Sequence, residues 1–183
     1  RDVDVTLRDM RQVPSKILIS GYVDGDLELA KEFIDHSPLA SKLSEPLSVL
    51  GAGGVSKLNL ALDIPLNAPK NVPVGVAGRL FLDGNRMHLS AAELDISGIY
   101  GVLNFNREGL ENSALEASVY GEKALVNIRS SQQDEGVMTH IQVDTRLSAD
   151  LLSTRYSSGL LSYLSGSSLL RVQVNVGKSQ PLR

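Results

Sequence analysis

The chain has 183 residues, of which 42% are hydrophobic and 21% charged, and its formal net charge is −3. This length predicts a single domain with a sizeable core, and the globular composition excludes wholesale disorder. The slightly acidic balance argues against a nucleic-acid binder, which usually carries a basic field. Because the sequence has no cysteine, disulfides, thiolate metal sites and cysteine nucleophiles are excluded.

The apolar content is almost entirely aliphatic, because aromatic residues make up 4% of the chain and tryptophan is absent. This disfavours binding sites for carbohydrate or single-stranded nucleic acid, which stack on aromatic rings. No apolar run approaches the roughly 18 residues of a membrane span. The chain begins at Arg1 and carries no signal peptide, so we expect an internal piece of a longer protein.

The first predicted elements are two strands and two helices. Residues 3–7 and 17–19 alternate apolar and polar side chains, which is typical of strands with one apolar face. Residues 26–34 place apolar side chains at helical spacing. Ser37 and Pro38 have the types that begin a second helix, which we expect to reach Gly51 with a kink or early end at Pro46. The turn-forming run Asp24-Gly25-Asp26 is expected to be a turn plus helix cap.

Strand alternation then continues almost to the end of the chain. The predicted strands are 58–66, 72–82, 87–89, 94–96, 99–105, 124–128, 141–143 and 170–176, with a further helical candidate over 150–165. The short runs Asp83–Asn85, Arg107–Gly109 and Tyr120–Lys123 are interpreted as hairpin loops between them. Short strands joined by such loops predict an antiparallel meander.

The two helical regions stand in similar surroundings. Each follows a short strand, begins with Asp-Leu (Asp26 and Asp150) and leads through Gly/Ser residues into another strand. We interpret this as a weak repeat, with residues 1–147 as one full module, including short helices near 26–50, and 148–183 as the start of the next. A long repeat with an open end favours an extended array.

The sequence gives little support for a catalytic or metal-binding site. His36, His88 and His140 lack metal-ligand spacing and are interpreted as solvent-exposed. The glycine-rich run at 51–54 lacks the remainder of a phosphate loop, and Asp24–Asp26 lacks the remainder of a calcium loop. We therefore expect no enzyme, no metal and no cofactor. What stands out is the clean aliphatic face of each strand, which either packs against another such face in a sandwich or lines a groove filled by lipid.

Several segments in order resemble one family. They are His36–Leu39, Leu58–Leu66, Gly75–Leu82, Leu94–Phe105, Glu108–Leu110 and Ala117–Gly121. Together they resemble the repeated module of the AsmA-like, bridge-like lipid transport proteins of the Gram-negative envelope, a family that includes YhdP and TamB. Their order and spacing carry the resemblance, because each motif alone is degenerate.

The resemblance implies a mainly β fold with short helices, in which repeated antiparallel modules form a curved, taco-like open groove. It implies a periplasmic segment of an inner-membrane-anchored protein that shields acyl chains as phospholipids move between the inner and outer membranes. The partners would be phospholipid acyl chains, neighbouring modules of the same chain and other envelope proteins, with no nucleic acid. The alternative is an extracytoplasmic β-sandwich-like binding or structural module without lipid. The expected lining residues are Leu58, Leu60, Leu62, Ile64, Val74, Val76, Leu80, Leu82, Leu94, Ile96, Ile99, Leu103, Phe105, Val126, Ile128, Ile141 and Val143.

Overall fold

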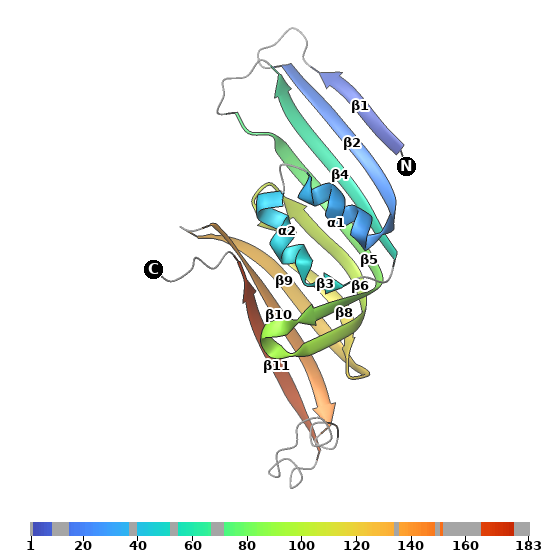
Figure 1. Cartoon of the computed structure of the whole chain (residues 1–183), viewed down its shortest axis with the longest axis vertical. Coiled ribbons are helices and arrows are strands. Elements are labelled where there is room, and N and C mark those ends of the chain that lie inside the picture. The colour runs from blue at the N-terminus through green and yellow to red at the C-terminus, as the bar shows by residue number, and fades with distance from the viewer. Residues whose placement is uncertain are drawn as a thin grey trace.

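A computed structural model describes residues 2–8, 15–36, 40–51, 55–66, 72–133, 136–148, 151 and 166–177. Among these, eleven strands form one antiparallel sheet, accompanied by two helices and a short 3-10 helix (Figure 1). The strands are β1 (Asp2–Arg8), β2 (Ser15–Asp26), β3 (Leu50–Gly51), β4 (Val55–Leu66), β5 (Gly75–Leu89), β6 (Leu94–Asn106), β7 (Gly109–Leu110), β8 (Ser113–Val119), β9 (Glu122–Gln133), β10 (Gly136–Ser148) and β11 (Ser167–Val176). The helices are α1 (Leu27–Asp35), α2 (Ala40–Ser48) and η1 (Ser90–Ala92).

The sheet is open. Its strand order is β1-β2-β4-β5-β6-β8-β9-β10-β11, with β3 beside β5 and β7 beside β6. Within the described residues β1 and β11 form its two ends and do not pair with each other. In Figure 1, β1, β2 and β4 lie at one end of the curved sheet and β9, β10 and β11 at the other, with α1 and α2 between them. The predicted fold class, mainly β and antiparallel with few helices, is confirmed.

The alternation of the sequence produces one continuous apolar face. Residues directly opposite each other in an antiparallel ladder point to the same side of the sheet. Leu62 of β4 lies opposite Ile19 of β2 and Val76 of β5, and Val143 of β10 lies opposite Val126 of β9 and Val172 of β11. The apolar positions of neighbouring strands therefore meet in rows across the sheet, on what we call the inner face.

The arrangement of β1, β2 and β4 recurs in β9, β10 and β11. In the first group the helices lie between β2 and β4 along the chain, and Ile17 lies opposite Leu7 and Ile64. In the second group β10 and β11 are neighbours separated by residues 149–166, and Ile141 lies opposite Ile128 and Val174. The two strand triplets thus match in order, pairing and apolar phase.

The hairpin loop predicted at Asp83–Asn85 is wrong. β5 runs through these residues as one strand, and its pairing with β6 shifts register there. Gly84 takes a positive φ of 78°, and the backbone N–H of Asp83 donates to Oδ1 of Asn85 at 2.9 Å. Buried Asn85 also donates to Oγ of Ser56 at 3.2 Å. An Asp-Gly-Asn run is typical of a tight turn, but the same conformational freedom and local hydrogen bonding also form a β-bulge.

The predicted strands 94–96 and 99–105 are one strand, β6. The apolar phase changes between Ile96 and Ile99 because Gly98, with a φ of 56°, forms an irregularity in the pairing with β8. The other two predicted turns are confirmed, since β6 and β7 are joined at Arg107 and Glu108, and β8 and β9 at Tyr120 and Gly121.

The first helix is confirmed, and the end of the second is corrected. α2 continues past Pro46 to Ser48, and Leu50–Gly51 forms β3 against β5 instead of a helix end. The expected turn at Asp24–Asp26 is wrong, because these residues pair with β4 as the end of β2. Of the remaining predictions, Ser37 and Pro38 lie outside the described residues, as does the helical candidate 150–165 except for Leu151.

Candidate functional site

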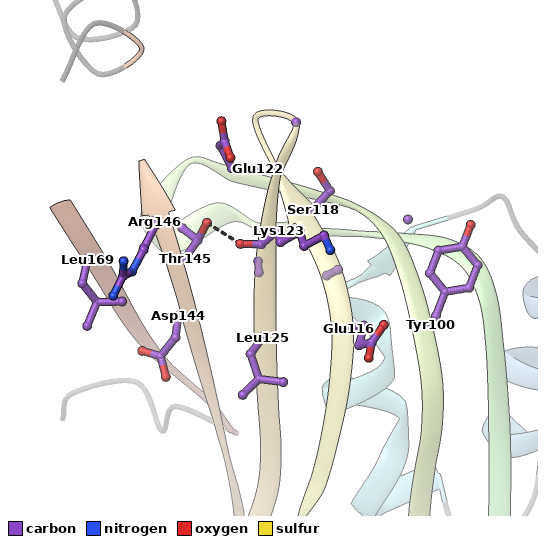
Figure 2. Close-up of a pocket in the computed structure, with 14 residues that line it drawn as sticks. Tyr100, Glu116, Ser118, Glu122, Lys123, Leu125, Asp144, Thr145, Arg146 and Leu169 are labelled. Atoms are coloured by element: carbon purple, nitrogen blue, oxygen red, sulfur yellow. Dashed lines mark hydrogen bonds between the residues drawn. The ribbon is translucent and has the colours of Figure 1, made fainter. Parts of the chain in front are cut away.

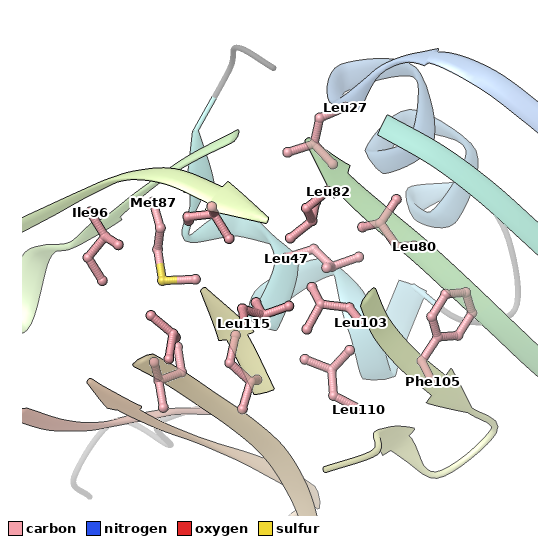
Figure 3. Packing of buried hydrophobic residues seen from close by; sticks show 14 of the residues in the cluster. Leu27, Leu47, Leu80, Leu82, Met87, Ile96, Leu103, Phe105, Leu110 and Leu115 are labelled. Atoms are coloured by element: carbon pink, nitrogen blue, oxygen red, sulfur yellow. The ribbon is translucent and has the colours of Figure 1, made fainter. Parts of the chain in front are cut away.

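Of the seventeen expected lining residues, all but Val74, which precedes β5, lie on strands at inner-face positions, and most are covered by protein. Leu62, Ile64, Val74 and Val76 are half-buried. The other thirteen are buried in one hydrophobic cluster: Leu58, Leu60, Leu80, Leu82, Leu94, Ile96, Ile99, Leu103, Phe105, Val126, Ile128, Ile141 and Val143. Figure 3 shows part of this cluster, with side chains from β5, β6 and β8 converging with those from the helices. The inner face is therefore filled over much of its length and partly uncovered near one end, where Leu62 and Val76 pack against the border of the cluster.

Burial changes along a single strand. On β4, Leu58 and Leu60 expose 2% and 9% of their surface, whereas every residue from Leu62 to Leu66 is half-buried. The clean alternation of exposed and buried positions stops at the same point. Since residue types and phase are the same on both sides of this point, the difference comes from what lies above the strand.

The helices cover the first of these two parts. α1 contacts β2 and β4, and it also contacts α2. Leu27 and Ile34 of α1 and Leu43 and Leu47 of α2 are buried in the cluster. Sequence analysis placed these leucines on helical faces but did not assign them to the inner face of the sheet, because spacing within a helix does not say which strands it covers.

Other elements cover β9, β10 and β11. β7 contacts β9 and β10, and η1, at the turn between β5 and β6, contacts β11. Ala92 of η1 and Val172, Val174 and Val176 of β11 pack against the buried cluster. The bent tip of the β5–β6 hairpin thus lies over the far end of the sheet.

The β1 end of the inner face is exposed. Val3, Val5 and Leu7 expose 68%, 63% and 47% of their surface. They lie opposite Gly21, Ile19 and Ile17 of β2. Sequence analysis recognised their alternation but did not include them among lining residues, although the same period-2 signal identifies them. These three side chains form an exposed apolar row at the β1 end of the inner face.

A large hollow lies elsewhere, on the outer face. Its volume is about 970 Å³, and its lining includes exposed Tyr100, Leu125 and Leu169 together with Glu116 and Arg146 (Figure 2). These residues alternate with inner-face positions along β6, β8, β9, β10 and β11. Its mixed charges and its side of the sheet separate it from the predicted aliphatic lining.

One ion pair shapes the electrostatics of the outer face. Nε of Arg171 on β11 donates to Oδ1 of Asp144 on β10 at 2.6 Å, and the amide of Gln142 donates to the other carboxylate oxygen at 2.8 Å. The bond from Arg171, followed by that from Gln142, holds the pKa of Asp144 below its ordinary value. The same bond raises the pKa of Arg171. The pair fastens β11 to β10 and does not face the inner side.

The histidines take structural roles. His88 bonds Asp95 at 2.7 Å on an exposed edge of the β5–β6 hairpin. Nε2 of His140 on β10 forms a hydrogen bond with Oγ of Ser131 on β9 at 2.9 Å, and its Nδ1 with Oδ1 of Asn175 on β11 at 2.8 Å. His140 is half-buried, so it is less exposed than the sequence predicted. In the described part of the chain no three His, Asp or Glu residues are grouped as a metal site would require.

Comparison with known protein families gives a match over nearly the whole chain. A family model described as YhdP protein matches residues 1–182. No curated protein and no solved structure matches the chain. Among the described helices, none has both the length and the apolar character that crossing a bilayer requires.

Proposed function

The chain belongs to the YhdP family, and from that premise we propose that it is a segment of a hydrophobic conduit for phospholipids. In this proposal the segment lies in the periplasm, as part of a protein anchored in the inner membrane of a Gram-negative bacterium. Its inner face shields acyl chains as the lipids pass between the inner and outer membranes. Neighbouring modules of the same chain, and other envelope proteins, would extend the path.

The observation that carries the proposal is the unbroken apolar inner face. It begins with Val3, Val5 and Leu7 on β1 and continues, across the register shifts of the β5–β6 and β6–β8 pairings, to Val172 and Val174 on β11. Its rows are aliphatic and contain few rings or charges. A uniform lining of this kind contacts acyl chains without fixing them at one point, which suits passage better than storage.

Energetics explain why such a face is useful. Exposing one methylene group to water costs about 0.8 kcal/mol. A lipid with two acyl chains and roughly 30 such groups therefore faces a cost on the order of 25 kcal/mol in water. An apolar surface that accompanies the chains lowers most of that barrier, while the polar headgroup stays hydrated.

The recurring strand triplets support an array of modules. The trio Leu7, Ile17 and Ile64 of the first triplet corresponds to Ile128, Ile141 and Val174 of the second. This correspondence supports the repetition itself, whereas the assignment of residues 1–147 to one module and 148–183 to the beginning of the next stays a prediction. Repetition of this kind lengthens an apolar face without changing its cross-section.

The test is site-specific photocrosslinking in intact cells whose phospholipids carry radioactive phosphate. A crosslinking amino acid with a diazirine on an aliphatic side chain replaces Leu62, which is half-buried on the inner face. The matched control is Ala61, the next residue on β4, which is exposed on the outer face. We expect label on the protein from position 62 and little from position 61. Equal label at both positions, or none at 62, would contradict the proposal.

A second candidate is a structural module without lipid, whose apolar faces cover each other. The observation that favours it is the burial of thirteen of the seventeen expected lining residues by protein. Native mass spectrometry of the protein purified from bacteria distinguishes the two. A stoichiometric phospholipid load favours the conduit, whereas a lipid-free, cooperatively folding protein favours the structural module.

A further inference from the structure

The two helices form a segment fastened at both ends. α1 follows β2 without an intervening loop, since Asp26 ends the strand and Leu27 begins the helix. After α2, the backbone N–H of His88 donates to the carbonyl of Val49 at 3.0 Å, and β3 pairs with β5. We call α1 and α2 together the helical strap, because the two helices lie over the inner face between these two attachments.

The helical strap presents its apolar side to the sheet. Leu27, Ile34, Leu43 and Leu47 are at most 2% exposed, whereas Leu29 on the opposite side of α1 is 44% exposed. Figure 3 shows Leu27 and Leu47 pointing towards side chains of β5 and β6. The strap therefore fills the volume that an acyl chain would need in order to contact the sheet beneath it. Where the strap is absent, from Leu62 onwards on β4, the inner face is partly uncovered.

Little in the strap favours its helices independently of this packing. Each helix has nine residues, which is shorter than an isolated helix needs for stability in water. α2 contains Pro46, which supplies no amide hydrogen to the helix. The side chain of Asp26 makes no capping hydrogen bond to α1, and Oγ of Ser44 is buried with no hydrogen-bond partner among the residues that the structure describes. A buried, unpaired hydroxyl weakens the packed state relative to an open one.

From this geometry we infer that the helical strap is a displaceable gate: acyl chains and the strap compete for the same part of the inner face. The inference rests on the proposed function. In the closed state described here, lipid reaches the uncovered part of β4 near Leu62 but not Leu60. When the strap lifts, with its two ends still attached to the sheet, the apolar rows beneath it join the uncovered part.

The test fixes the helical strap against the sheet with a reversible disulfide bond. α2 contacts β7, and Leu47 of α2 and Leu110 of β7 belong to the same buried cluster. Cysteines replace these two residues, and thiol labelling verifies first that oxidation joins them. The sequence contributes no other cysteine. The diazirine amino acid is placed at Leu60 beneath the strap or at Leu62 outside it, in cells with radioactive phospholipids. We expect oxidation of the cysteine pair to lower the label at position 60 about tenfold and to leave position 62 unchanged. Reduction should restore the label, and single-cysteine variants should not respond.

A second pair of variants changes the strap without a crosslink. Ile34→Ser removes an apolar contact of the strap with the sheet and should raise the label at position 60. Leu29→Ser, on the exposed side of the same helix, should not. Ser44→Ala removes the unpaired hydroxyl and should lower that label by favouring closure. These substitutions keep the test decisive if the cysteine pair prevents folding.

The outcomes separate the two proposals. Label at position 62, together with label at position 60 that depends on the lock, supports the gate. Label at position 60 that is unaffected by the lock overturns the gate, because lipid then reaches Leu60 without movement of the strap. Label at 62 with none at 60 in any variant also overturns it, because the strap is then a fixed part of the core. Absence of label at both positions contradicts the conduit itself.

Discussion

The strand triplets β1-β2-β4 and β9-β10-β11 have the same order, pairing and apolar phase, yet their inner faces differ in exposure. Val5 is 63% exposed, whereas Val126, its counterpart in the second triplet, is fully buried. β7 and η1 contact the second triplet, and α1 covers only part of β2 and β4 in the first. The comparison shows that alternation determines which way a side chain points, while elements distant in the sequence determine whether it meets protein or remains uncovered.

Ile17→Ala and Ile141→Ala test this difference at corresponding positions. Ile141 is buried among β9, β10 and β11, so its truncation should lower the free energy of unfolding by about 2–5 kcal/mol. Ile17 is half-buried, and its truncation should cost less than half as much. Chemical denaturation of the two variants measures both values. Equal losses would show that the β1 end is covered in solution as fully as the second triplet.

Gly78→Ala tests the border between covered and uncovered parts of β5. A Cβ at Gly78 would lie 2.1 Å from Cζ of Phe105, so the ring must move. We expect a loss of about 1–3 kcal/mol in unfolding free energy, and Phe105→Leu should recover part of it. Gly25→Ala is the control, because its nearest contact would be 3.4 Å. A stable Gly78→Ala protein would mean that Phe105 does not pack over the strand.

Asn85→Ala tests the bulge that lets the β5–β6 hairpin cover the second triplet. Loss of the hydrogen bonds of this buried side chain, among them those with Asp83 and Ser56, should cost about 1–3 kcal/mol. Hydrogen exchange should then increase in β11, which η1 contacts, and stay unchanged in β1. Asn59→Ala, at an exposed outer-face position of β4, provides the matched control. Uniformly faster exchange throughout the sheet would argue against a local role of the bulge.

The smallest effect is expected at the ion pair of the second triplet. Because the bond from Arg171 lowers the pKa of Asp144 in the folded protein, its contribution to stability is present above the unfolded carboxyl pKa of about 3.9. The contribution is lost as the pH falls below that value and through the folded pKa. Asp144→Asn should therefore flatten the loss of stability in acid by a small amount, as denaturation between pH 6 and about 2 would measure. If the Asp144→Asn variant loses stability in acid as the unmodified protein does, the ion pair does not stabilise the folded protein.

Most strands followed from the sequence because part of each alternates apolar and polar residues, as β4 does from Leu58 to Leu66. The two short hairpins at Glu108 and Gly121 followed from local turn chemistry. Asp83–Asn85 did not, since a turn and a bulge use the same residue types, and only the partner strand decides between them. The prediction that the second helix includes Leu50 was wrong for a similar reason, because pairing with Met87 of β5 overrides the helical spacing of Leu50.

The sequence predicted which face of the sheet carries the candidate site, but not what covers that face. The expected lining residues share one face because their periodicity fixes it, and Leu62 and Leu58 differ only through the helices above them. No periodicity within α1 identifies the strands that it contacts. Whether lipid replaces the helical strap is likewise a competition between two apolar partners, and it depends on contacts made over long sequence distances.

The paired irregularities in β5 and β6 have a consequence for insertions and deletions. Inner positions are even-numbered up to Leu82 and odd-numbered from Met87, and the facing strand changes parity at the same level, between Ile96 and Ile99. Because each strand changes phase once here, loss of one residue from one strand would restore regular alternation in that strand but leave it one residue short of its partner, which keeps its own irregularity. Loss of one residue from each strand would keep the two strands equal in length and their pairing in register. Length changes at this level are therefore expected to be tolerated in pairs.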